Sequence, residues 1–172
     1  NVFGFGGGVG FDKNPNTAIE IGAQFQNRSF SEGDAVDDAT DDGGAAYLVA
    51  ARAWMKRGGS MTLVPAVKMW SIDQSVAVIT APGVTTTFDD KLSGWQIGAA
   101  GNWAVGSNDL FVLGVQFLSN KEDEGTAGEY TQSLMPNLFM ALETHLNPWL
   151  TFRAGAQQSG GSNHRNHVPG VE

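Results

Sequence analysis

The chain has 172 residues, and only 16% of them are Asp, Glu, Lys or Arg, against about 25% in an average soluble domain. The net charge of −8 and the lack of a basic stripe argue against a nucleic-acid partner. Zero cysteines exclude a disulfide scaffold and a thiolate metal site. No run of about 18 apolar residues and no signal peptide is present, so we expect no transmembrane helix and a mature or truncated sequence.

The first two segments alternate with a period of two residues, which is typical of β-strands. In residues 2–11 the odd positions are mostly aromatic or aliphatic and the even positions are glycine. In residues 17–26 apolar side chains alternate with Glu20, glycine and glutamine. One parity is thus apolar and uncharged, whereas the other is small, amide-rich and sparsely charged.

The pattern recurs along the rest of the chain. The further predicted strands are residues 46–56, 61–70, 92–103, 110–118, 134–146 and 150–158. Alternation is weaker in 46–56 and 61–70, because Leu48, Trp54 and Trp70 share the parity of the lysines and Arg52. Each segment has roughly 9 to 11 residues, the length that a tilted strand needs to cross a hydrocarbon layer. Since proline removes a ladder hydrogen bond, we expect a β-bulge at Pro65.

Short and long connections alternate between these strands. The short ones are residues 12–16, 57–60, 104–109 and 147–148, and the long ones are residues 28–44, 71–91, 120–129 and 159–172. In outer-membrane barrels short turns face the periplasm and long loops face outside. The first strand would then start outside and the eighth would end outside. We therefore expect at least one further strand at each end, and a barrel of ten or more strands.

The sequence predicts an all-β fold, an antiparallel up-and-down meander of about eight strands. It would form a transmembrane β-barrel, or an open part of a larger one, within a single domain over residues 1–172. The apolar parity is predicted to face lipid at Phe3, Phe5, Ile19, Ile21, Trp95, Ile97, Phe111, Leu113, Leu138 and Phe152. The polar parity is predicted to face the lumen at Glu20, Gln24, Arg52, Lys56, Lys68, Gln96, Gln116, Asn137, Glu143 and Arg153.

The segment Ala141 to Gln157, ALETHLNPWLTFRAGAQ, resembles a hairpin of bacterial outer-membrane β-barrel proteins, in the broad group of porins and hydrophobic-solute channels. The resemblance covers 17 residues. It implies an outer-membrane location, contact with lipid and lipopolysaccharide, small solutes as partners and no cofactor, and it leaves homo-oligomerisation open. Such proteins usually end in a strand with a terminal aromatic residue. This chain ends in Pro169-Gly170-Val171-Glu172, so we expect that strand to be missing.

The lumen-facing charges allow two interpretations. They could line a water-filled pore and bias which solutes pass. They could instead pair with one another as a structural plug. A passive channel for small solutes, a soluble ligand-binding barrel and an outer-membrane structural or adhesion barrel without a pore remain as alternatives.

Other chemistry receives little support from the sequence. The glycine-rich residues 3–10 lack the spacing of a nucleotide-binding loop. The acidic segment with Asp37, Asp38, Asp41 and Asp42 does not match a calcium loop, and a solvated loop is the simpler interpretation. His164 and His167 are candidate ligands in an expected disordered tail. Ser133 and His145 share a parity but lie twelve residues apart, so we expect no catalytic triad and no enzyme activity.

Overall fold

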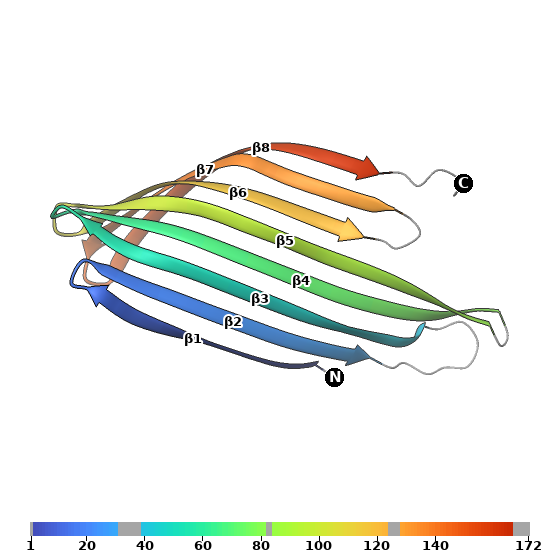
Figure 1. Cartoon of the computed structure of the whole chain (residues 1–172). Coiled ribbons are helices and arrows are strands. Elements are labelled where there is room, and N and C mark those ends of the chain that lie inside the picture. The colour runs from blue at the N-terminus through green and yellow to red at the C-terminus, as the bar shows by residue number, and fades with distance from the viewer. Residues whose placement is uncertain (1, 31–38, 82–83, 124–127, 167–172) are drawn as a thin grey trace.

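The computed structural model describes residues 2–30, 39–81, 84–123 and 128–166 of the chain. Their strands are β1 (Val2–Asn14), β2 (Thr17–Phe30), β3 (Ala39–Arg57), β4 (Met61–Ala81), β5 (Val84–Val105), β6 (Asp109–Asp123), β7 (Glu129–Asn147) and β8 (Leu150–Asn166). They form one sheet in chain order, and each neighbouring pair is antiparallel (Figure 1). The predicted all-β, up-and-down meander is confirmed.

The predicted short connections are turns. Gly58 and Gly106 have φ angles of 69° and 67°, the left-handed region that glycine enters without a steric penalty. In the first and last turns an asparagine side chain accepts a backbone hydrogen bond: Asn14 from the amide of Asn16 at 2.9 Å, and Asn147 from that of Trp149 at 3.1 Å. These Asx contacts explain why asparagine stands at both turns.

The strands are longer than predicted, between 13 and 22 residues. The predicted loop 71–91 is largely strand, since β4 runs to Ala81 and β5 starts at Val84. Strands also extend into the predicted loops 28–44, 120–129 and 159–172, so these loop boundaries are wrong. Beyond an apolar layer both faces of a strand can be polar, and the two-residue alternation that identifies a strand then disappears.

The register divides the side chains between two faces, because residues directly opposite each other in an antiparallel pair point to the same side. One face carries Phe5, Phe25, Val67, Ile97 and Leu113. The other carries Glu20, Arg52, Lys68, Gln96 and Gln116. A hollow in the curved sheet is lined by all five named residues of the second set, and by Val67 alone of the five named in the first set. We call the first set the convex face and the second the concave face.

The predicted bulge at Pro65 is wrong. Arg52 pairs with Ala66 and Met55 with Leu63, so the register of β3 and β4 is the same on both sides of the proline. The ladder skips Ala53 and Trp54 instead, while Pro65 keeps its pairing with Ala99 on β5. The interruption of the ladder on the β3 side of Pro65 thus accommodates the missing proline N–H, and no extra residue is inserted in either strand.

A bulge occurs in β7, at residues 135–136. The register there shifts against both neighbours, since Leu134 and Asn137 pair with Leu118 and Gln116 of β6, and with Gly161 and Ser159 of β8. A bulge places two residues opposite one and so reverses the parity. The convex face therefore takes odd positions of β7 before the bulge and even positions after it, which explains the change of parity in the sequence.

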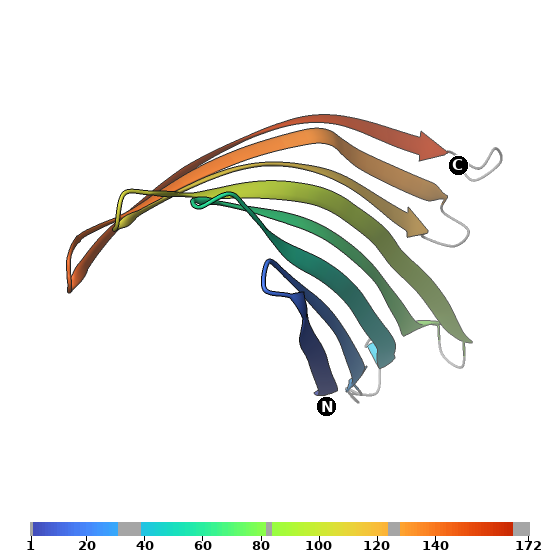
Figure 2. The same cartoon turned by 60° about the vertical axis from the view of Figure 1, so that its left-hand side comes forward.

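The sheet curls round an open space, with β1 and β8 at its two separate edges (Figure 2). Among the described residues no hydrophobic side chain is buried. The chain exposes 11674 Å² of surface, whereas a compact globular protein of this length exposes about 8100 Å². The apolar side chains do not converge into a core. Most of the exposed large ones, including Phe5 and Leu113, lie on the convex face.

Candidate functional site

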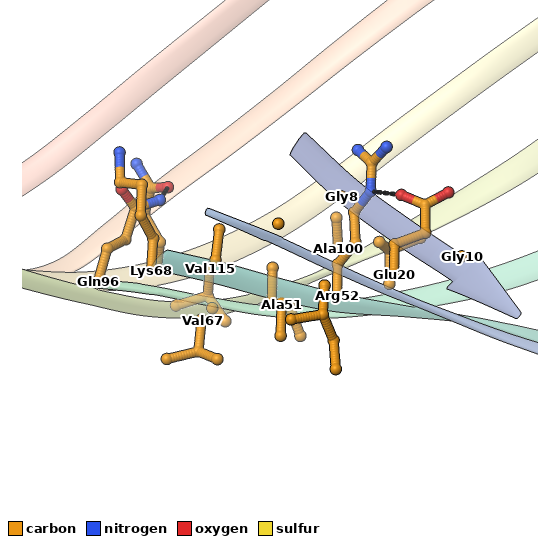
Figure 3. Close-up of a pocket in the computed structure, with 18 of the residues that line it drawn as sticks. Gly8, Gly10, Glu20, Ala51, Arg52, Val67, Lys68, Gln96, Ala100 and Val115 are labelled. Carbon is orange, nitrogen blue, oxygen red and sulfur yellow. Dashed lines mark hydrogen bonds and ion pairs between the residues drawn. The ribbon is translucent and has the colours of Figure 1, made fainter. Parts of the chain in front are cut away.

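The concave face contains a hollow of about 680 Å³ that spans β1 to β7. Its walls combine small residues, such as Gly8, Gly98 and Ala100, with a few charges and amides. Figure 3 shows Arg52 and Glu20 facing each other at one end, and Lys68 beside Gln96 at the other. The strands β2 to β5 position these four side chains, because each occupies an inward position of its strand.

All ten residues predicted to face the lumen lie on the concave face, and all ten predicted to face lipid lie on the convex face. The structure thus separates the two sets as the two-residue alternation predicts. It also places Leu48, Trp54 and Trp70 on the concave face. These three large side chains therefore share the face of the charges, as their parity indicates.

Four of the concave charges form two cross-strand ion pairs. Arg52 Nε donates to Glu20 Oε2 across β2 and β3. Arg153 Nε lies 2.5 Å from Glu143 Oε2 across β7 and β8, and His145 Nε2 lies 3.3 Å from Glu143 Oε1. These two ion pairs agree with the interpretation in which the lumen-facing charges pair with one another as a structural plug.

Lys68 is different. Within the described residues no ion pair forms at its ammonium group, whose Nζ lies 4.8 Å from the ring centre of Trp70. This distance is typical of a cation–π contact. The positive charge is therefore held in place without being neutralised.

Amide side chains continue the polar lining beside Lys68. Gln96 pairs with Lys68 in the register, and its Nε2 donates to Gln116 Oε1 at 2.7 Å. Asn137 is the partner of Gln116 on β7 and is only 1% exposed. Polar groups thus follow one another from β4 to β7. Gln24, on β2, lies next to a separate hollow among the glycines of β1.

Glycines on the concave face make room for its aromatic rings. A Cβ atom on Gly114 would lie 2.2 Å from Cζ of Phe139, its partner on β7. A Cβ atom on Gly94 would lie 2.4 Å from Cζ2 of Trp70, its partner on β4. Each ring therefore lies over the backbone of a glycine. For Trp70, this packing over Gly94 holds in place the ring that contacts Lys68.

The convex face has a central belt without charges. On β4 the outward residues from Met61 to Met69 are all uncharged, over about 26 Å along the strand. At the end near the longer connections the belt meets serines, among them Ser71 and Ser93, which are partners. Beyond them come cross-strand ion pairs, Asp73 with Lys91 at 3.4 Å and Lys121 with Glu129 at 2.7 Å.

Aromatic side chains gather at both borders of this belt. Phe5 and Phe25 lie 5.5 Å apart between ring centres, and Tyr47 is the partner of Phe25 at the level of Ser71. At the opposite border, near the short turns, the ring centres of Trp103 and Phe111 are 5.8 Å apart. The belt is thus bounded by rings at two levels.

The remaining candidate residues lie away from the hollow. Asp37, Asp38 and His167 fall outside the described residues, while Asp41 and Asp42 lie near the start of β3 and His164 lies in β8. Ser133 and His145 have the same parity, which predicted a shared face. They lie on opposite faces, because the bulge in β7 is between them. Within the described ranges, no three His, Cys, Asp or Glu residues are grouped as metal ligands.

The sequence interpretation missed three features of these faces: the serine border, the outer ion pairs and the aromatic–glycine pairs. The β-branched residues Val76, Val78 and Ile79 are the signal that could have extended β4 to this region. The pairing of Trp70 with Gly94 depends on the register and has no local signal.

Comparison of the chain with protein-family models, curated proteins and solved structures finds no match. The described part of the chain contains no helix that is long and apolar enough to span a membrane. The functional interpretation therefore depends on the geometry of the two faces.

Proposed function

We propose that the chain forms the wall of an outer-membrane β-barrel in a Gram-negative bacterium, which acts as a passive channel for small solutes. The observation that carries this proposal is an eight-stranded sheet that has no buried apolar core among the described residues and that carries most of its exposed large apolar side chains on its convex face. Water is a poor solvent for such a face, whereas hydrocarbon is a good one. The concave face would then line an aqueous path.

The borders of the convex belt support a membrane location. A strand tilted by roughly 40° reduces 26 Å of uncharged strand to about 20 Å across the membrane, close to the apolar band of about 25 Å in known barrels. Rings at both borders correspond to the aromatic girdles of such barrels. The ion pairs beyond Ser71 and Ser93 would lie in the headgroup region or in water.

A barrel without an open pore is the second candidate. The cross-strand pairs Glu20–Arg52 and Glu143–Arg153 favour it, because paired inward charges can fill a narrow lumen. Lys68 favours the channel, since its charge is not neutralised by an ion pair among the described residues. A soluble ligand-binding barrel fits less well, because its apolar side chains would face inward.

Reconstitution tests the proposal. We expect the full chain to require detergent for monodispersity and to produce discrete conductance steps in a planar lipid bilayer. A chain that stays monodisperse without detergent would contradict the membrane location. A chain that inserts into vesicles with β-sheet circular dichroism but carries no current would instead support the barrel without a pore.

A further inference from the structure

We propose that the hollow around Lys68 binds a small organic anion with an apolar body, such as an aromatic carboxylate. The inference rests on the proposed function, because it names the class of solute that the concave face would recognise. Three observations carry it: the charge of the lining, the position of the Lys68 ammonium group and the apolar walls beside it.

The lining has one positive charge in excess. Its charged residues are Glu20, Arg52 and Lys68, that is two cations and one carboxylate. Glu20 and Arg52 form an ion pair and neutralise each other. The Lys68 ammonium is left as the group that a bound carboxylate would neutralise, and hydrogen bonds between charged groups are stronger than those between neutral ones.

The position of Lys68 suits a fixed anion site. Its Nζ contacts the Trp70 ring, and that ring is held over Gly94. Across the strand pair, Gln96 donates to the Oε1 of Gln116, which leaves the Nε2 group of Gln116 as a second donor for a carboxylate. The Lys68 ammonium on β4 and the Gln116 amide on β6 lie on the two sides of Gln96, and both can donate to the oxygens of one carboxylate.

The rest of the hollow is apolar. Val64, Ala66, Ala100 and Phe139 join the glycines in its walls. A volume of about 680 Å³ lies within the range of about 300–1,000 Å³ that is usual for small-molecule sites. A hydrated inorganic anion would gain nothing from these walls, whereas the ring of an aromatic acid would bury apolar surface against them.

The test is calorimetric titration of the full chain in detergent with sodium benzoate. Benzyl alcohol and benzylamine serve as the neutral and cationic analogues of the probe. We expect benzoate to bind most tightly and benzylamine least. In the Lys68→Gln variant the affinity for benzoate should fall about tenfold or more, the usual effect of losing a charged hydrogen bond. Lys68→Arg should retain binding, and Lys121→Gln, outside the hollow, should match the unsubstituted chain.

Gln96→Glu gives a second, independent variant. It places a carboxylate beside Lys68 without changing side-chain size, and it should abolish benzoate binding while β-sheet circular dichroism is unchanged. Benzoate and benzyl alcohol binding with equal affinity would overturn the proposal. So would unaltered benzoate affinity in folded Lys68→Gln or Gln96→Glu protein.

Planar-bilayer recordings separate this inference from the proposed function. Binding of benzoate in detergent without any conductance would refute the channel and leave the anion site intact. Conductance whose block by benzoate is the same in the unsubstituted and Lys68→Gln chains would support the channel and refute the anion site.

Discussion

The convex and concave faces are made of alternate residues of the same strands, yet they place charge differently. On the convex face the ion pairs Asp73–Lys91 and Lys121–Glu129 lie beyond the uncharged belt. On the concave face Glu20, Arg52 and Lys68 lie level with that belt. The overall composition hides this difference. The sidedness of each charge, and not the number of charges, indicates which solvent a face meets.

The largest expected effect comes from placing a charge on the wrong face. Val67→Lys introduces an ammonium into the middle of the convex belt, whereas Val64→Lys introduces one on the concave face of the same strand. In lipid vesicles Val67→Lys should lower the free energy of unfolding by about 2–4 kcal/mol. Val64→Lys should change it by only about 0.5 kcal/mol. Urea titration with tryptophan fluorescence measures both.

Equal losses in these two variants would show that the two faces meet the same solvent. A larger loss in Val64→Lys would assign the lipid to the concave face and so reverse the proposed orientation.

A smaller effect is expected from the glycine beneath Phe139. Gly114→Ala would push the ring off the backbone, because the new Cβ atom would lie 2.2 Å from its Cζ atom. Overpacking of this kind costs about 1–3 kcal/mol. Gly7, on the convex face of β1, is the control. A Cβ atom added to Gly7 meets nothing within 4 Å, so Gly7→Ala should be neutral or slightly stabilising.

Thermal or urea unfolding of both glycine variants provides the measurement. The loss in Gly114→Ala should largely disappear when Phe139→Ala is the background, because the clash is then absent. An undiminished loss in that background would rule out the ring as its cause.

The smallest effect concerns the border of the convex face. The hydrogen bond from Lys121 to the Glu129 carboxylate raises the pKa of Lys121 above its ordinary value of 10.5. A raised pKa means that the contribution of Lys121 to stability is fully present below pH 10.5 and is lost as the pH rises through the folded-state value. Unfolding of Lys121→Met and of the unsubstituted chain should therefore differ at neutral pH and converge above that pKa.

The fold class and the two faces could be predicted from sequence because one parity, as in Phe3 and Phe5 or Ile19 and Ile21, carries no charge over whole segments. The strand ends could not be predicted in this way. Past Ser71 polar and apolar residues no longer alternate between the two parities, so the period of two is lost, although the β-branched Val76, Val78 and Ile79 still favour a strand.

The candidate site was predictable as a face but not as a set of contacts. The parity of Glu20, Arg52 and Lys68 indicates a shared side, but only the register shows that Glu20 meets Arg52 while Lys68 meets Gln96. The two prolines show the same limit. Pro65 lies in an unshifted register and Pro136 lies in a bulge, and which proline shifts the register depends on pairings across neighbouring strands.

The bulge in β7 also determines how this strand can tolerate changes in length. Its two halves are out of phase by one residue, so that Thr131 and Met140 reach the same face although their numbers differ in parity. Deletion of one residue at 135–136 would remove the bulge and leave both halves on their present faces, because Leu134 and Asn137 would then lie two positions apart, as their partners on β6 and β8 already do. Deletion of one residue in a regular part of β7, such as Met140, would instead turn the residues on one side of it over to the other face. A single-codon deletion at 135–136 should therefore be far less harmful than one at Met140.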